Sequence, residues 1–311
     1  MPTKIIIYLF RLAARFPLCF SQWVGAGLGW FAYQLPTRER GITRVNIALC
    51  FPNLSEKERE ERVRASLIET GKMMVEMPGS LLGASADAWA AGEPGEGFAR
   101  LQQVLDHGKG VIVAGPHMGN WEVALRHLTT RSRVTALYRQ PKMEGLDQFI
   151  RDGRSRSGAN LVPANIQGVK SLYAALKNRE IMAILPDQQP KGTGDKGGVF
   201  APFFGQSALT MLLVNRLARK TGAPVLFWYA ERLPGARGFR LNCLEAPEGI
   251  ADPDPLVAAA ALNKGLEACI RRCPDQYLWS YKRFSRQPDG GISPYPRVRR
   301  GSLKPKKTRF A

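Results

Sequence analysis

The chain is poor in the side chains that most often carry chemistry, with three histidines and five cysteines among 311 residues. The cysteines are odd in number and form no Cys-x-x-Cys pair, so we expect neither a disulfide framework nor a zinc site. Reduced thiols are typical of a domain that faces the cytoplasm. No serine lies in a Gly-x-Ser-x-Gly setting and no cysteine neighbours a histidine, which argues against a covalent intermediate. We predict no metal and no cofactor.

Acidic residues are also scarce, because 26 Asp and Glu stand against 45 Lys and Arg and leave a net charge of +19. Such an excess indicates an anionic partner, either nucleic acid or acidic lipid. Residues 282–311 carry ten Lys or Arg and one acid, Asp289. Residues 288–311 are interrupted by proline and glycine, so we expect a basic, flexible tail. The tail would attract acidic headgroups and nucleic acid alike.

The N-terminal segment is apolar and favours lipid over nucleic acid. Residues 16–35 contain no charged side chain, and about twenty such residues can span a bilayer core. Glycines and polar residues dilute the run, so an interfacial helix with basic flanks and a buried soluble helix stay open. A cleaved signal peptide fits poorly because Arg11 and Arg15 interrupt the apolar region. We expect residues 1–36 to be a membrane anchor or interfacial helix, with the remainder on the cytoplasmic side.

Apolar strand-like runs alternate with helical patterns through residues 37–287. This alternation predicts an α/β fold, with a mostly parallel central sheet covered by helices on both faces, behind an N-terminal membrane-associated helix. Ser55-Glu-Lys-Glu58 is a capping-box pattern that predicts a helix start. The expected strands cover residues 111–114, 134–138, 181–185, 224–232 and 239–244. The expected helices cover residues 56–76, 98–107, 120–128, 144–154, 168–178 and 208–221.

The segment Gly115–Glu122 (GPHMGNWE) places His117 and Glu122 five positions apart, where a strand gives way to a helix. A histidine released at a strand end can act as a general base, and a nearby carboxylate can orient the ring. We predict that His117 is the base and Glu122 its orienting acid. Asn120 is expected to cap the helix, whose free amides could hold an oxyanion or phosphate. The alternative is a surface histidine, with Glu122 merely favouring the positive helix end.

Two further strand ends bring polar groups to the same edge. Arg139 follows the strand over 134–138, and Asp187 with Gln188 follows the strand over 181–185. In open α/β sheets, sites lie outside the carboxyl ends of the strands, so we expect these side chains to converge with His117. A purely structural ion pair between Arg139 and Asp187 is the alternative.

Several blocks of the chain resemble the bacterial late lipid A acyltransferases of the lauroyl/myristoyl type, within the lysophospholipid acyltransferase-like superfamily. Gly115–Glu122 is similar to the family's His-x4-acid motif. In the closing block Tyr281 stands where histidine is common. The other similar blocks are Tyr138-Arg139, Asp187-Gln188, Phe200–Gly205 with Ala208–Thr210, and Gln276–Phe284.

This resemblance implies transfer of a fatty acyl chain from acyl carrier protein to a hydroxyl of a lipid A precursor or related glycolipid. It places the reaction at the bacterial inner membrane, on the cytoplasmic side. His117 would take the hydroxyl proton, so that the oxygen attacks the thioester directly, and Glu122 would orient the ring. Acyl carrier protein is strongly acidic and would be a second partner for the basic surface.

The resemblance also implies substrate-binding roles. Arg139 would hold an acceptor phosphate or the oxyanion, and Asn120, Asp187 and Gln188 would contact substrate. Lys282 and Arg283 would meet phosphate, although a solvated basic strip is an equal reading.

Two other functions stay open. The same fold could act on a phospholipid or an amino-acid lipid. A basic nucleic-acid-binding protein is the remote alternative; it leaves the N-terminal apolar run unexplained, and the core shows no aromatic pattern of an RNA-recognition motif. We therefore expect no nucleic acid among the partners.

Overall fold

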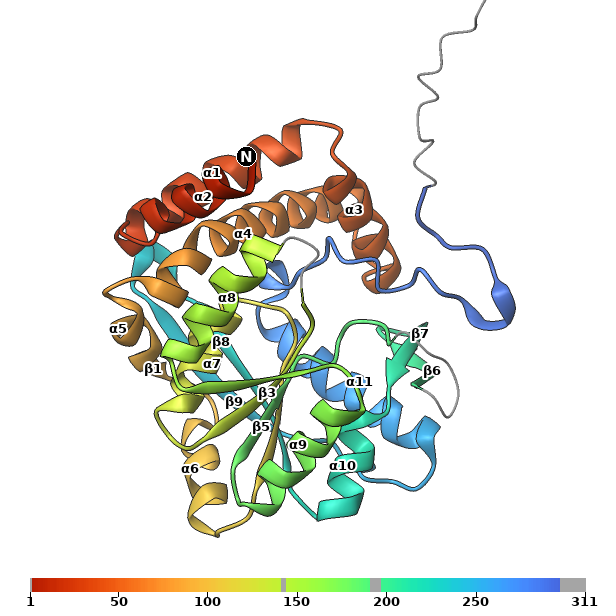
Figure 1. The fold of residues 1–311 in the computed structure, drawn as a ribbon. Helices are drawn as coiled ribbons and strands as arrows, with labels where there is room; N and C mark the ends of the chain where they lie inside the picture. The colour runs from red at the N-terminus through yellow and green to blue at the C-terminus, as the bar shows by residue number, and fades with distance from the viewer. Residues whose placement is uncertain (1, 141–143, 191–196, 297–311) are drawn as a thin grey trace, which may run out of the picture.

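A computed structural model describes residues 2–140, 144–190 and 197–296 of the chain (Figure 1). Its centre is a seven-stranded sheet of order β1-β9-β8-β2-β5-β3-β4, in which only the β8–β9 pair is antiparallel. The predicted mostly parallel α/β sheet is therefore confirmed. The strands are β1 (Glu93–Pro94), β2 (Val111–Ala114), β3 (Val134–Tyr138), β4 (Ala159–Pro163), β5 (Ile181–Ile184), β8 (Val225–Arg232) and β9 (Phe239–Glu245).

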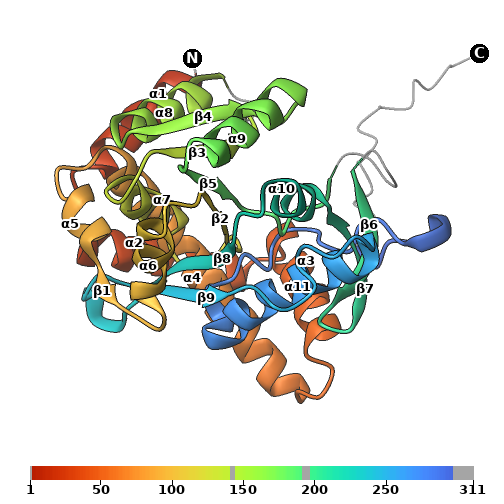
Figure 2. The same ribbon diagram turned by 90° about the horizontal axis from the view of Figure 1, so that it is seen from below.

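Helices cover both faces of this sheet, as its apolar strands require (Figure 2). In β2, Val111 and Val113 belong to one core cluster and Ile112 and Ala114 to the other. The first cluster includes residues of α5 (Ala86–Ala91), α6 (Phe98–Asp106) and α7 (Trp121–Thr129). The second includes residues of α9 (Ile166–Lys177), α10 (Leu213–Thr221) and α11 (Pro255–Arg272). The remaining helix of the sheet domain, α8, covers Glu144–Arg156.

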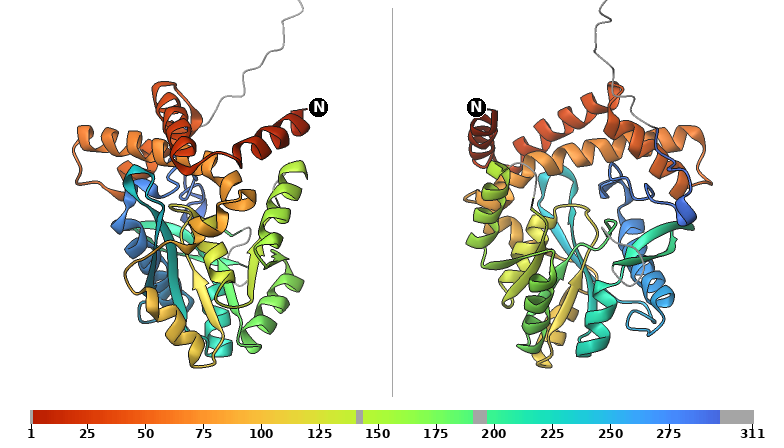
Figure 3. Two further views of the ribbon diagram at one scale, coloured as in Figure 1. Left: turned by 90° about the vertical axis from the view of Figure 1, so that its left-hand side faces the viewer. Right: turned by 45° about the vertical axis from the view of Figure 1, so that its right-hand side comes forward.

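Four N-terminal helices form a further layer beside the sheet (Figure 3). Gly25 and Gly29 of α2 lie so close to α4 that a side chain on either would meet its backbone at 2.4 or 2.3 Å. The two helices therefore pack backbone against backbone. None of the described helices is long and apolar enough to cross a membrane. The four helices are α1 (Pro2–Ala13), α2 (Leu18–Gln34), α3 (Arg38–Cys50) and α4 (Glu56–Leu82).

The boundaries of most predicted elements hold, with two clear exceptions, whereas β4 and α11 were not predicted. The capping box of Ser55 and Glu58 is confirmed, but α4 continues past the predicted end at residue 76, to Leu82. The helix predicted over 208–221 is wrong in its first part, because Gln206–Met211 is strand β7, paired antiparallel with β6 (Gly198–Phe203). The two strands are joined at Phe204 and Gly205, both with positive φ, and α10 begins only at Leu213.

The predicted tail lies partly outside the described residues. Residues 297–311 are not described, so their predicted flexibility stays a prediction. Within residues 288–296, Tyr295 is buried and its hydroxyl accepts a hydrogen bond from the amide of Phe284 at 3.0 Å. It also donates to Oδ1 of Asn46 at 2.5 Å.

Candidate functional site

The loop that carries His117 joins the central strand β2 to α7 and is fixed by backbone hydrogen bonds. The amide of Gly119 donates to the carbonyl of Gln276 at 3.1 Å, and the amide of Leu278 donates to the carbonyl of His117 at 2.9 Å. Gly119 has φ +57°, and a Cβ there would lie 1.9 Å from the carbonyl oxygen of Ala230. Only glycine fits this position, so the Gly119 of the motif shapes the loop.

Asp187, at the end of β5, binds the ring of His117. Its Oδ1 lies 2.6 Å from Nδ1, and its Oδ2 accepts from the His117 amide at 3.0 Å. β2 and β5 are adjacent and parallel, with Ala114 opposite Ile184, which brings the two strand ends together. Burial opposes ionisation of Asp187, but the charge and hydrogen bonds of His117 outweigh it and lower the pKa of the carboxyl. The ionised Asp187 favours the tautomer with the proton on Nδ1, which leaves Nε2 as the acceptor.

Glu122 does not orient His117, contrary to our prediction. Both of its oxygens bind the guanidinium of Arg154 on α8, with Oε1 at 2.6 Å from Nη2 and Oε2 at 2.9 Å from Nε. The indole of Trp121 donates to Oε1 as well, at 3.1 Å. Glu122 is buried in the first turn of α7 and faces α8, whereas the histidine meets the carboxylate at the neighbouring strand end.

Asn120 caps α7 as predicted, since its side chain accepts from the amide of Val123 at 3.1 Å. The side chain is fully buried, and its amide donates to Glu76 at 3.1 Å and to Ser80 at 2.9 Å. These contacts occupy the side chain, so it holds the loop to α4 instead of meeting substrate.

Glu76 and Arg232 form a buried ion pair behind the loop. Both oxygens of Glu76 lie 2.6 Å from the Arg232 guanidinium, which also binds Glu69 at 2.7 Å and the carbonyl of Gly119 at 3.2 Å. Burial opposes the charge of Arg232, but the two glutamates outweigh it and raise its pKa. This cluster joins α4, the end of β8 and the His117 loop, and no pattern along the chain predicted it.

The other predicted contact residues divide into exposed and buried. Arg139 is exposed, with no hydrogen bond or ion pair to any described residue, so the alternative pair with Asp187 is absent. Gln188 and Lys282 are half-buried, and Nζ of Lys282 lies 5.4 Å from the ring centre of Tyr295. The side chains of Arg139, Gln188 and Lys282 are therefore still accessible to a substrate, as the prediction requires.

Arg283 is a correction, because it is buried and cannot meet a phosphate from solvent. Its guanidinium donates to the carbonyl of Leu209 at 2.6 Å and to Oγ1 of Thr210 at 2.9 Å. Burial lowers the pKa of the Arg283 guanidinium. Its positive charge also helps to lower the pKa of Asp187. The side chain anchors the closing block to strand β7.

Two tyrosines of the closing block enclose the His117–Asp187 pair. Tyr277 is buried beside Asp187, and burial together with that carboxylate raises its pKa well above the ordinary value. The hydroxyl of Tyr281 accepts from the amide of Gln189 at 2.9 Å. The positive field of Arg139 acts on Tyr281, so Arg139 lies near this side of the site. Tyr281 was noted only as a departure from the resembled pattern.

An apolar cavity of about 80 Å³ lies beside the motif loop. Pro116, Met118 and Trp121, the neighbours of His117 and Glu122, form part of its wall, and the Trp121 ring lies 5.2 Å from that of His117. Arg154 adds the guanidinium that binds Glu122. The other walls are aliphatic and aromatic side chains, including Ala124, Leu128, Ala136, Ala183, Leu185 and Trp228. This lining is as apolar as a hydrocarbon chain requires, but its volume is below that of ordinary ligand pockets, so its side chains must move apart to admit a long chain. Among the described residues, no group of three or more His, Cys, Asp or Glu could hold a metal.

Comparison with known proteins extends the likeness along nearly the whole chain. The family model of the bacterial lipid A biosynthesis acyltransferases matches residues 3–286. The lipid A biosynthesis palmitoleoyltransferase of Escherichia coli K12 is 31% identical over 305 residues, covering 90% of this chain and 95% of that protein. The lauroyltransferase of the same strain is 28% identical, covering 91% of each chain. Its myristoyltransferase is 24% identical, over 90% of this chain and 86% of its own.

Proposed function

Because this chain belongs to the bacterial lipid A biosynthesis acyltransferase family, we propose that it transfers a fatty acyl chain to a hydroxyl of a lipid A precursor. The observation that carries the mechanism is the hydrogen bond of 2.6 Å between Nδ1 of His117 and the buried Asp187. It supports an imidazole that presents Nε2 as a base at the end of the central strand.

In this mechanism the acceptor hydroxyl gives its proton to Nε2 of His117 as its oxygen attacks the thioester carbonyl of acyl carrier protein. Asp187 stabilises the imidazolium that forms. When the C–S bond breaks, the carrier thiolate leaves and takes the proton from His117. The products are the acyl ester and the free carrier thiol, and no enzyme nucleophile takes part.

The apolar cavity, widened by movement of its side chains, is the proposed chamber for the donor's acyl chain. It reaches the loop of His117 through Pro116 and Met118, so a chain within it places its carbonyl near the base. The exposed Arg139 and the half-buried Lys282 lie at the same sheet edge and supply positive charge for an acceptor phosphate. Glu122 would act through Arg154, which it holds at the cavity wall.

The N-terminal helices are the proposed membrane-binding surface, on the cytoplasmic side of the inner membrane. α1 and α2 expose large apolar side chains, among them Trp23 at 73% and Tyr8 at 68% of their full accessible area. Arg11, Arg15 and Arg38 flank them and are exposed. An apolar face with basic flanks suits a helix that lies in the interface. α4 connects this layer to the His117 loop through Glu76.

The test is the His117→Ala variant, assayed with acyl carrier protein donors and a lipid A precursor in detergent. We expect a loss of about a hundredfold or more, since a general base contributes at least that much. His107→Ala is the matched control, because His107 is exposed on α6's C-terminal end and should leave the rate unchanged.

Retention of activity within about tenfold by the folded variant would overturn the base assignment. Mass spectrometry of the products identifies the acceptor. A new ester on a phospholipid or amino-acid lipid, with none on the lipid A precursor, would favour the alternative acceptor.

A further inference from the structure

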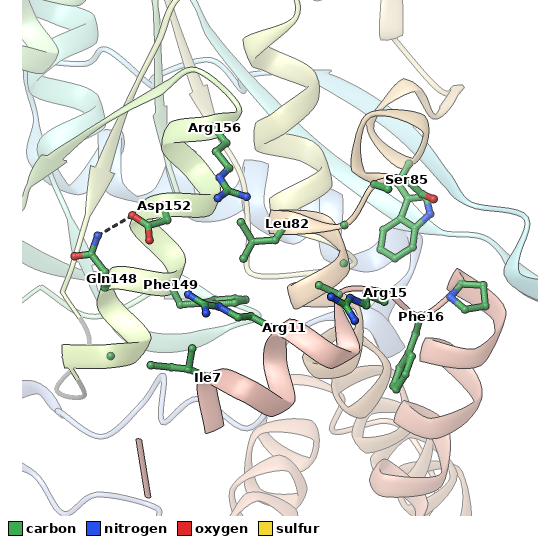
Figure 4. Close-up of a pocket in the computed structure, with 17 residues that line it drawn as sticks. Ile7, Arg11, Arg15, Phe16, Leu82, Ser85, Gln148, Phe149, Asp152 and Arg156 are labelled. Atoms are coloured by element: carbon green, nitrogen blue, oxygen red, sulfur yellow. Dashed lines mark hydrogen bonds between the residues drawn. The ribbon is translucent and has the colours of Figure 1, made fainter. Parts of the chain in front are cut away.

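A second hollow lies on the far side of α8 from the His117 loop. This groove has a volume of about 850 Å³ and is formed by α1, the C-terminal end of α4 and α8 (Figure 4). It shares no lining residue with the apolar cavity beside His117. α8 separates the two, because Arg154 turns toward Glu122 whereas Asp152 and Arg156 line the groove.

Three guanidinium groups border the groove, and none of them is ion-paired in the described part of the chain. Arg11 comes from the last turn of α1, Arg15 from the turn that follows α1, and Arg156 from the end of α8 (Figure 4). In the part of the chain that the structure describes, none of the three makes an ion pair, although Arg154 in the same stretch is paired at 2.6 Å. Asp152 is the one carboxylate of the lining, and it accepts from Gln148 at 2.7 Å. The border therefore carries a net charge of +2.

The wall of the groove is apolar. Leu82 lies between Arg156 and the other two arginines in Figure 4, with Phe149 beside Arg11, and Ile7, Phe16 and Trp89 extend the surface. The groove also adjoins the proposed membrane-binding surface, because Arg11 shares α1 with the exposed Tyr8, Leu9 and Leu12. A molecule that fits must combine an anionic head with a hydrocarbon chain and must be supplied by the membrane.

We propose that this groove binds one anionic glycerophospholipid, with its phosphate on Arg11, Arg15 and Arg156 and an acyl chain along Phe149 and Leu82. Charge complementarity selects the head, and the apolar wall selects the chain. The lipid is a resident ligand and not a substrate, since α8 stands between the groove and His117. The proposal rests on the proposed function only in placing the protein at a membrane.

The experiment is calorimetric titration of the full-length protein with a short-chain phosphatidylglycerol below its micelle concentration, and with the matching phosphatidylcholine. We expect one saturable site for phosphatidylglycerol. The triple variant Arg11→Gln, Arg15→Gln, Arg156→Gln should bind about a hundredfold more weakly, because each near-surface charge contributes about fivefold. The matched control removes three charges elsewhere, as Lys109→Gln, Arg133→Gln, Arg219→Gln, and should bind like the wild type.

Several results would overturn the proposal. Equal weakening by both triple variants would indicate diffuse attraction, and equal binding of glycerol phosphate without acyl chains would indicate a simple phosphate site. Displacement of the phospholipid by the lipid A precursor, together with a raised KM for the precursor in the groove variant, would assign the groove to the acceptor. Acyl transfer in detergent separates this test from the proposed function: His117→Ala should lose its kcat and still bind phosphatidylglycerol like the wild type.

Discussion

Nδ1 of His117 and Oδ1 of Asp187 lie 2.6 Å apart, although 70 positions separate the two residues in the chain. They meet because β2 and β5 are adjacent and parallel and both residues lie just past the strand ends. The acid partner of the histidine is thus supplied by sheet topology, while the acid of the sequence motif, Glu122, pairs with Arg154.

Asp187→Asn should lower kcat by about a hundredfold to ten-thousandfold while leaving the fold intact. The amide keeps the shape but cannot stabilise the imidazolium and can hold the ring in the wrong tautomer. The lowered pKa of Asp187 means that its charge is present above the unfolded value of about 3.9 and is lost only as pH falls through the folded value. The carboxylate is therefore ionised between pH 6 and 8. The measurement is kcat of both proteins in this range, with thermal unfolding as the control for folding. A folded Asn variant within tenfold of wild type would contradict this role.

Glu122→Gln and Arg154→Lys should both slow acyl transfer, because each breaks the same ion pair. The first removes the charge that pairs with the partly buried guanidinium of Arg154, and the second cannot form the two-point contact. Each single change should lower kcat at least about tenfold, and the double variant should be little worse than the poorer single one, because contacting residues are not additive. A double-mutant cycle on kcat measures this coupling. Fully additive losses would show that Glu122 acts independently of Arg154.

Ala124→Leu should shift the preferred donor toward shorter acyl chains. Ala124 lines the apolar cavity, and three extra carbons would fill part of its volume of about 80 Å³. Rates with a series of acyl carrier protein donors of increasing chain length measure the shift. Activity with the shorter donors serves as the internal control for folding. An equal loss with every chain length would mean that the chain lies elsewhere.

Arg232→Met should destabilise the protein by about 3–5 kcal/mol, because it leaves Glu76 buried without its cation. The double variant Arg232→Met, Glu76→Gln should recover much of this loss, since it removes the uncompensated charge. Urea unfolding of both variants gives the two free energies. A loss below about 1 kcal/mol in the single variant would mean that water reaches Glu76.

His127 should make the fold sensitive to acid. Its Nδ1 donates to the carbonyl of Ala90 at 2.7 Å and its Nε2 accepts from Arg131 at 3.2 Å, so the neutral ring fits and burial lowers its pKa. A lowered folded pKa means that the unfolded chain binds the proton first, so stability falls as pH drops below about 6.5. His127→Gln should flatten the dependence of the unfolding free energy between pH 7 and 5. An unchanged slope would assign the sensitivity to other groups.

Much of the sheet could be predicted from sequence because its strands are short, continuous apolar runs. Val111–Ala114 and Val134–Tyr138 were predicted with their observed bounds, since parallel strands buried on both faces have this composition. β7 was not, because Ala208–Met211 suits a helix as well as a strand. Pairing with β6 makes this segment a strand, and such a tertiary contact cannot be recognised from the local sequence.

In the site, too, local features could be predicted from sequence and tertiary contacts could not. His117 could be found because its strand and helix flank it in the sequence, and Asn120 was recognised as the cap. Arg283 was predicted to meet phosphate or to lie in a solvated basic strip, and only the fold reveals its buried contacts with Leu209 and Thr210. The partner of the histidine required knowing which strand lies beside β2, and spacing along the chain does not contain that information.

The absence of side chains at Gly25 and Gly29 has a mechanical consequence. The backbones of α2 and α4 are in contact there, and Gln22 of α2 also donates to Glu76 of α4 at 2.9 Å. A displacement of α2 would therefore move α4 and its Glu76, and through Glu76 the side chain of Asn120. A larger side chain at either glycine would push α2 away from α4. The proposed membrane contact of α2 and the position of the His117 loop would then be disturbed together.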